Sequence, residues 1–296
     1  MKALLLTVTL YLFSTLQLHA DDLRVSTTEL LKSPNKYKVL DVRNFAEYQK
    51  GHIPNAINFP VTLTYADNKL NGKLTDPFSM QNIVQNLGLY ADDTLVIYGD
   101  GSFFDAARLF WALEVYGFKN VKLLNSGYDS WSLEDYPTTT QVPNIVKSDY
   151  ITIIDSNRIA TKFSTQIATK NPNQIIIDAR PPKAYKGEVS SAKRFGHIPK
   201  ALNIPASHNI NSSTLKEISE LQDVYKDIPK KKKIILYCAI GKISATNYFA
   251  LRELGYNVSN YDASWKEWGN DFQLPVVNPS KHIQKIFGKE PTSHKW

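Results

Sequence analysis

The sequence predicts an α/β protein of two similar domains, each an open parallel sheet with helices on both faces. Its 296 residues are enough for about two domains. Short apolar runs alternate with segments of helical periodicity, which is typical of β-α-β units. The segment Gly51-His52-Ile53-Pro54 returns as Gly196-His197-Ile198-Pro199, and this long-period repeat indicates a duplicated domain.

Each predicted strand is a short, almost wholly apolar run, as expected for strands covered on both faces of a sheet. In the first half these runs are residues 38–41, 95–98 and 121–124. In the second half they are residues 175–178, 201–204, 234–237 and 258–261. Apolar residues at helical spacing predict a helix at 105–116, and another at 244–254 directly after the strand 234–237.

Composition along the chain sets the expected boundaries. Residues 1–20 combine Lys2, an apolar run and a short polar end, which predicts a cleaved signal and a periplasmic or secreted protein with no stable membrane anchor afterwards. The remaining boundaries are an N-terminal domain at 21–138, a polar linker at 139–149, a C-terminal domain at 150–278 and a basic tail at 279–296.

The net charge of +7 favours anionic small-molecule partners. Nucleic acid is not expected, because the basic residues are dispersed and no recognised binding motif is present. The lysine run at 230–233 is interpreted as a solvated approach to the next strand.

Cys238 is the only cysteine, so the chain cannot form an internal disulfide and offers too few thiols for a cysteine metal site. Two roles remain open: an apolar filler of the core, or a single reactive nucleophile. The residue follows a predicted strand and precedes a turn with Gly241, where an α/β sheet binds ligands. Loop amides and the following helix would favour a thiolate, with added charge from Lys242. The nucleophile is the favoured reading, with no metal or organic cofactor.

The tandem halves, the two Gly-His-Ile-Pro segments, the Cys-x-x-Gly loop and the segment 261–268 resemble a two-domain rhodanese. The resemblance covers nearly the whole chain beyond the signal. It implies a sulfurtransferase whose second domain is catalytic and whose first domain is a degenerate copy. In the internal alignment, Gly99 occupies the place of Cys238, so the first domain has no thiol.

The resemblance further implies that Cys238 takes sulfur from an anionic donor, thiosulfate foremost and 3-mercaptopyruvate second, and passes it as a persulfide to cyanide or a thiol. Arg180 would bind the donor, although a structural ion pair is an equal alternative. Arg194 and Lys186 could supplement it. The loop residues of the implied site are Ala239, Ile240, Gly241 and Lys242. Ala239 and Ile240 match neither the Arg-Lys of thiosulfate-using relatives nor the small polar residues of mercaptopyruvate-using ones.

Two other functions stay open. One is a non-enzymatic carrier of sulfane sulfur that a partner protein loads. The other is a phosphatase or arsenate-reducing enzyme, whose loop is one residue longer and ends in arginine, whereas this chain has Ser244 at the sixth position after Cys238.

Several polar residues are interpreted as structural because they recur in the half without a thiol. They are His52 with His197 and Asp41 with Asp178. The first-domain residues Asp100, Asp105 and Arg108 are interpreted as scaffold, since no nucleophile accompanies them.

Overall fold

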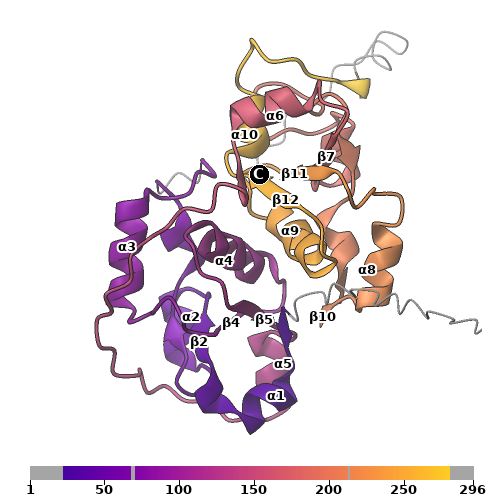
Figure 1. Cartoon of the computed structure of the whole chain (residues 1–296). Coiled ribbons are helices and arrows are strands. Elements are labelled where there is room, and N and C mark those ends of the chain that lie inside the picture. The colour runs from indigo at the N-terminus through magenta and orange to yellow at the C-terminus, as the bar shows by residue number, and fades with distance from the viewer. Residues whose placement is uncertain (1–22, 68–70, 213, 281–296) are drawn as a thin grey trace, which may run out of the picture.

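The computed structural model describes residues 23–67, 71–212 and 214–280, which form two α/β domains (Figure 1). The first domain contains β1 (Arg24–Val25), α1 (Thr27–Lys32), β2 (Lys38–Asp41), α2 (Phe45–Lys50), β3 (Ile57–Asn58), α3 (Pro77–Asn86), β4 (Leu95–Tyr98), α4 (Phe104–Val115), β5 (Val121–Leu124) and α5 (Tyr128–Leu133). The second contains β6 (Ile159–Ala160), α6 (Lys162–Ala168), β7 (Gln174–Asp178), α7 (Pro182–Tyr185), β8 (Leu202–Asn203), β9 (Ile210–Asn211), β10 (Thr214–Leu215), α8 (Ile218–Val224), β11 (Lys233–Tyr237), α9 (Ser244–Glu253), β12 (Val258–Tyr261) and α10 (Ser264–Trp268).

The two main sheets have the same topology, which confirms the predicted fold class and duplication. Their strand orders are β1-β5-β4-β2-β3 and β6-β12-β11-β7-β8, and neighbouring strands in each are parallel. The register is also shared, because Asp41 lies opposite Tyr98 in one sheet and Asp178 opposite Tyr237 in the other. The residues that follow these tyrosines, Gly99 and Cys238, therefore occupy equivalent positions.

The segment that joins the domains runs along the first domain for longer than the predicted linker at 139–149. Tyr150 is buried and stacks on Phe118 with ring centroids 4.5 Å apart. Further along, the amide of Asp155 donates to the carbonyl of Val115 at 2.8 Å. The second fold thus begins with β6 rather than at residue 150, because an aromatic side chain within a polar stretch finds a hydrophobic site on the first domain.

The predicted signal at 1–20 lies outside the described residues, as does most of the predicted basic tail. Within the described ranges, no helix is long and apolar enough to cross a membrane.

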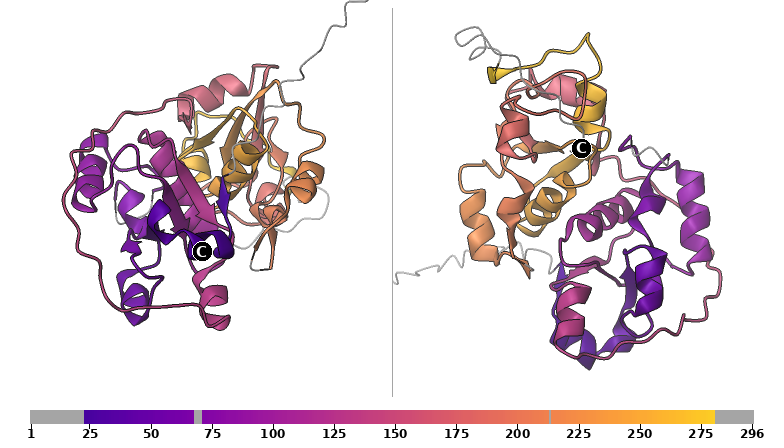
Figure 2. Two further views of the ribbon diagram at one scale, coloured as in Figure 1. Left: turned by 60° about the horizontal axis from the view of Figure 1, so that its bottom comes forward. Right: turned by 180° about the vertical axis from the view of Figure 1, so that it is seen from behind.

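Helices α4 and α9 lie side by side at the junction of the domains in opposite views (Figures 1 and 2). Phe110 of α4 meets Phe249 of α9 edge to face, with centroids 4.9 Å apart. Nearby, the Glu114 carboxylate accepts hydrogen bonds from Tyr248 at 2.5 Å and from Arg252 at 2.8 Å. The first domain therefore holds the helix that follows Cys238.

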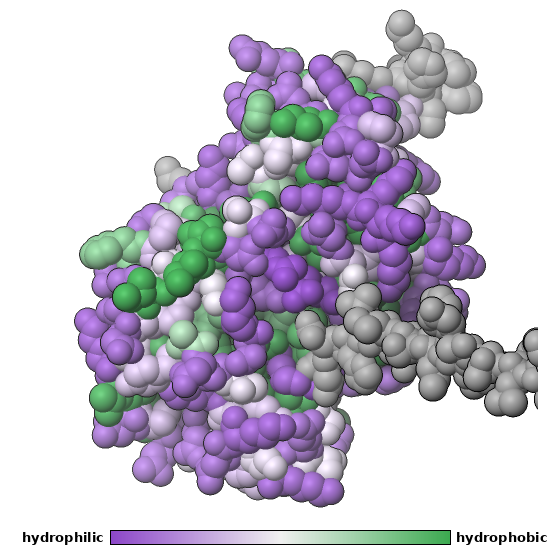
Figure 3. Space-filling model, viewed as in Figure 1, coloured by the Kyte–Doolittle hydropathy of each residue, from purple (hydrophilic) through white to green (hydrophobic). Residues whose placement is uncertain are grey.

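The face of the molecule in Figure 3 is mainly hydrophilic, with apolar residues gathered on the first domain beside α3. The joining segment lies along this helix, where the amide of Thr152 donates to Gln81 at 3.0 Å. It carries the exposed side chains of Val146, Ile151 and Ile153.

The buried pair between domains predicts a stability effect. Replacing Glu114 with alanine removes the buried carboxylate to which both the Arg252 guanidinium and the Tyr248 hydroxyl donate. We expect a loss of about 3 kcal/mol, which corresponds to roughly 6–12 °C in the unfolding midpoint. Lys50→Ala is the control, since its ion pair with Glu47 is exposed and its loss changes stability by less than about 0.5 kcal/mol. Equal midpoints for the two variants in thermal unfolding would contradict the importance of the interdomain pair.

Candidate functional site

Cys238 directly follows β11 and begins the loop that leads to α9. Its side chain is 0% exposed and packs with Ala179 and Ala206, while the partly exposed Phe104 and Ile243 cover the same cluster. Phe104 comes from the first domain. A small molecule therefore reaches the sulfur only when side chains at this boundary move.

The carbonyl groups of the loop are held from outside it. The amide of Trp265 donates to the Cys238 carbonyl at 3.0 Å, and the amide of Lys266 donates to the Ala239 carbonyl at 2.9 Å. The carbonyl of Gly241 accepts from the Asn260 side chain at 3.0 Å. These contacts fix the orientation of successive peptide planes.

Because a trans peptide is planar, the amide that follows each held carbonyl points the opposite way. The amides concerned are those of Ala239, Ile240 and Lys242. Within the described part of the chain, none of them donates to a protein acceptor. Successive free amides of this kind form a nest of positive potential that binds an anion.

Gly241 permits the loop to turn. Its φ is +70°, and a Cβ atom there would lie 2.4 Å from the carbonyl oxygen of Asp262. Only glycine fits both the backbone conformation and the space.

Arg180 forms the structural ion pair that was one of its two predicted roles. Its Nη2 donates to Asp178 at 2.6 Å and to the Gly196 carbonyl at 2.8 Å. Burial opposes the charge, but the Asp178 carboxylate prevails and raises the pKa of the guanidinium. Arg43 makes the same contacts with Asp41 in the domain that has no thiol. Nη1 of Arg180 is buried and has no hydrogen-bond partner among the described residues.

The structure does not place Arg194 in the site, which corrects its predicted role in binding. Its guanidinium donates to the main-chain carbonyls of Gly269 at 3.1 Å, Leu274 at 2.6 Å and Trp268 at 2.7 Å. It also donates to the Asp271 carbonyl. These bonds occupy the side chain in holding the end of the second domain.

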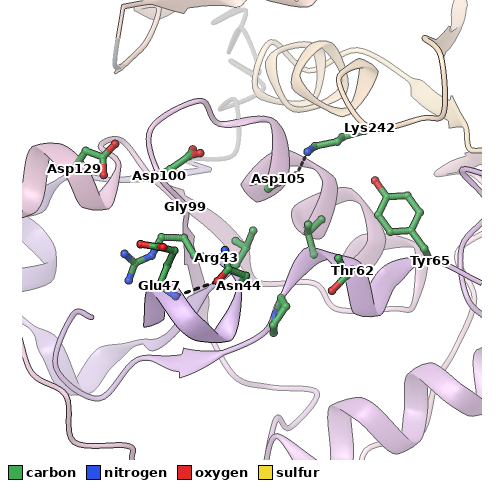
Figure 4. Close-up of a pocket in the computed structure, with 13 residues that line it drawn as sticks. Arg43, Asn44, Glu47, Thr62, Tyr65, Gly99, Asp100, Asp105, Asp129 and Lys242 are labelled. Carbon is green, nitrogen blue, oxygen red and sulfur yellow. Dashed lines mark hydrogen bonds and ion pairs between the residues drawn. The ribbon is translucent and has the colours of Figure 1, made fainter. Parts of the chain in front are cut away.

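Lys242 also differs from its predicted role as a charge at the mouth of the Cys238 loop. Its ammonium group pairs with Asp105 of the first domain at 2.6 Å (Figure 4). It lines a cavity of about 450 Å³ at the carboxyl ends of the first-domain strands. The local carboxylate attracts the ammonium group away from the loop, a pairing between domains that no sequence pattern indicates.

This cavity lies at the degenerate copy of the site, next to Gly99. Carboxylates dominate its charged lining, from Glu47, Asp100, Asp105 and Asp129 (Figure 4). Neither Cys238 nor another thiol lines it. In the described residues, no cluster of His, Cys, Asp or Glu is arranged to hold a metal ion.

The paired histidines make equivalent structural contacts. His52 stacks on Tyr48 at 3.7 Å and His197 on Tyr185 at 3.8 Å, and in each pair the histidine Nδ1 bonds to the tyrosine carbonyl. Burial lowers the pKa of His197. The recurrence of these contacts in the half without a thiol supports their structural interpretation.

Arg108, interpreted from the sequence as scaffold, lies beneath the Cys238 loop. Its side chain is fully buried in α4, and Nη1 donates to the Gly241 carbonyl at 3.2 Å. The one signal in the sequence is a charged residue within the apolar run at 106–113.

Comparison with known proteins shows what the chain resembles. The family model "Rhodanese-like domain" matches residues 26–134 and 160–271. A "Putative thiosulfate sulfurtransferase" of Haloferax volcanii is 36% identical over 253 residues, covering 81% of this chain and 88% of the relative. The "Sulfur carrier protein TtuD" of Thermus thermophilus is 34% identical over 267 residues, covering 84% and 93% respectively.

A solved structure agrees. The crystal structure of SseA from Escherichia coli, described as a 3-mercaptopyruvate sulfotransferase with the rhodanese fold, superimposes with a TM-score of 0.74 and 27% identity. The match covers 82% of this chain and 99% of that one.

The turn at Gly241 offers a matched pair of variants. In Gly241→Ala the new methyl group collides with the Asp262 carbonyl, whereas Gly255→Ala has a similar φ of +75° and nothing within 4 Å. We expect Gly241→Ala to slow the alkylation of Cys238 at pH 7 about tenfold, because displaced amides stabilise less thiolate. Gly255→Ala strains its backbone equally and should keep the wild-type rate. Since Cys238 is the only thiol, loss of free thiol measures the rate directly. Equal rates in both variants would show that the loop conformation does not control the sulfur.

Proposed function

We propose that this chain, which belongs to the rhodanese family of sulfurtransferases, carries the transferred sulfur as a persulfide on Cys238. The observation that supports the proposal is the loop itself. The loop carbonyls accept hydrogen bonds from residues outside the loop, so the free loop amides surround Cys238, the residue that follows β11. That arrangement stabilises an anionic sulfur without a metal ion or an organic cofactor.

The proposed donor is thiosulfate, with 3-mercaptopyruvate as the alternative. The Cys238 thiolate attacks the outer sulfur of thiosulfate, a new S–S bond forms, and sulfite leaves with the electron pair of the broken S–S bond. Cyanide or a thiolate then attacks the outer sulfur of the persulfide. The products are thiocyanate or a second persulfide, and Cys238 returns as thiolate, so charge and electrons balance.

The same amides serve both halves of this reaction. They face a thiolate before the donor arrives and a persulfide anion afterwards, and both carry one negative charge. Arg180 contributes mainly by holding its own strand end, since two of its nitrogen atoms are engaged with Asp178 and Gly196. Its Nη1 has no hydrogen-bond partner among the described residues, and we expect this atom to bind the sulfur donor.

A second candidate is a sulfur carrier that a partner protein loads. Three observations favour it: the burial of Cys238, the apolar residues Ala239 and Ile240 next to it, and the likeness to a relative named as a sulfur carrier. Steady-state turnover with small donors separates a carrier from an enzyme. A carrier accepts sulfur on Cys238 but does not cycle with thiosulfate or 3-mercaptopyruvate in the presence of cyanide or a thiol.

The geometry disfavours phosphate chemistry. Ser244 occupies the position at which phosphatase relatives carry arginine, and its buried hydroxyl bonds to Asn260 at 2.7 Å. The loop consequently offers no bidentate cation to a phosphoryl group.

We also propose export, on the basis of the signal-like composition of residues 1–20. The prediction is that the protein from its native host begins near residue 21 and fractionates outside the cytoplasm. N-terminal sequencing of the purified native protein checks this, and a chain that begins at residue 1 or 2 in the cytoplasm would contradict it.

The persulfide prediction uses intact-protein mass spectrometry. Wild-type protein treated with thiosulfate should gain the mass of one sulfur atom, and cyanide should then remove it with release of thiocyanate. Cys238→Ala should show neither change and no turnover. Arg194→Ala is the informative comparison, because its carbonyl contacts are remote from the loop and we expect it to load sulfur normally while losing stability. Loading of the Cys238→Ala variant would contradict the proposal.

A further inference from the structure

We propose that Arg108, in the thiol-free first domain, is a positioning residue for sulfur transfer that orients the Cys238 loop and supplies positive potential to the thiolate. This inference rests on the proposed role of Cys238. It gives the degenerate domain a direct part in the chemistry of the other.

The guanidinium of Arg108 is fixed at the junction of three segments. Nη1 donates to the Gly241 carbonyl at 3.2 Å, Nη2 to the Gly72 carbonyl at 3.1 Å and Nε to the Thr64 hydroxyl at 3.4 Å. One of these three acceptors belongs to the loop of the second domain, and the other two to the first. The side chain thus connects the loop to the rest of the first domain.

Aromatic rings hold the guanidinium in place. Its Cζ lies 4.5 Å from the ring centroid of Tyr65 and 4.6 Å from that of Trp111. Such faces attract a cation and restrict its rotation.

The contact with Gly241 acts on the amide nest. By holding that carbonyl away from the sulfur, Arg108 directs the following amide, that of Lys242, to the inner side of the loop. On the same side of the junction, Gly72 closely approaches Ile240, since a Cβ there would lie 2.6 Å from the Ile240 carbonyl oxygen. The first domain therefore supports the loop along its middle.

Arg108 also carries a buried positive charge. The side chain is fully buried, and it forms no ion pair with a carboxylate in the part of the chain that the structure describes. A buried charge is costly unless opposite charge compensates it. The groups whose negative forms interact with Arg108 are Tyr65, Asp262, Cys238 and Tyr116.

The two tyrosines of this set are neutral at pH 7. Burial raises the pKa of Tyr65 to about 12, and burial also raises that of Tyr116. Burial raises the pKa of Asp262 as well, although its carboxylate form accepts hydrogen bonds from the amides of Leu74 at 3.2 Å and Ala263 at 2.7 Å. The remaining group is Cys238, whose thiolate form the charge of Arg108 would stabilise.

Two ion pairs also lie near the loop. Asp178 with Arg180 lies beside β11, and Lys242 with Asp105 lies at the first-domain cavity. Each pair is close to neutral as a unit, so its field at the sulfur is small compared with that of a single charge. The charges of Arg108 and of the Asp262 carboxylate are opposite in sign, so we expect opposite effects on the Cys238 thiolate.

The experiment follows the alkylation rate of Cys238 by iodoacetamide as a function of pH in the full mature chain. For Arg108→Gln we expect the midpoint of the profile to rise by about one pH unit, and kcat/KM with thiosulfate and cyanide to fall about a hundredfold. Arg108→Lys retains the charge but not the planar set of donors. It should restore the midpoint while recovering kcat/KM only in part.

The opposite charge provides an independent arm. Asp262→Asn should lower the midpoint of the alkylation profile. This variant tests the proposal if Arg108→Gln fails to fold. The matched control is Arg252→Gln, which loses the interdomain contact with Glu114 and should lower the thermal midpoint without moving the alkylation profile. Unmoved profiles in folded Arg108→Gln, or in Asp262→Asn, would overturn the proposal. Alkylation requires no sulfur donor, so failure of wild-type protein to form a persulfide would instead count against the proposed function.

Discussion

The structure depends on the outward attachment of the carbonyl groups in the loop after β11. A loop without these contacts would adopt many conformations, in which its own carbonyls and amides would find other hydrogen-bond partners. Here the loop carbonyls accept hydrogen bonds from neighbouring elements. The donors are the amides of Trp265 and Lys266 and the side chains of Asn260 and Arg108. The amides are left for an anion. An orientation fixed before the reaction costs nothing when negative charge passes from one sulfur to the next.

Both domains use the same framework to position this loop, although one of them has no thiol. In each domain a tyrosine hydroxyl at the end of the central strand donates at 2.5 Å to a buried carboxylate at the end of the adjacent strand. An arginine two residues later completes each network. Both copies of the domain thus retain this hydrogen-bond network, whereas only the second has a thiol. The first domain instead contributes α4, which carries Phe104 over the thiol and Arg108 under the loop.

The central strands could be predicted from sequence because their burial on both faces leaves unbroken apolar runs, as in Leu95–Tyr98. The position of Cys238 followed from the same runs, since a strand end fixes where the next residue lies. The functions of individual cations could not be predicted. Arg194 and Lys242 are long side chains whose partners, Gly269 and Asp105, lie far away in sequence. Only the fold brings them together.

The full sequence contains one thiol, so the state of a single sulfur atom reports on the whole mechanism. The most direct measurement is a high-resolution crystal structure of protein treated with thiosulfate. We expect an added sulfur on Cys238 within hydrogen-bond distance of the amides of Ala239, Ile240 and Lys242, with the carbonyl contacts of the loop unchanged. A persulfide directed away from these amides, or a loop whose carbonyls have turned inward, would contradict it.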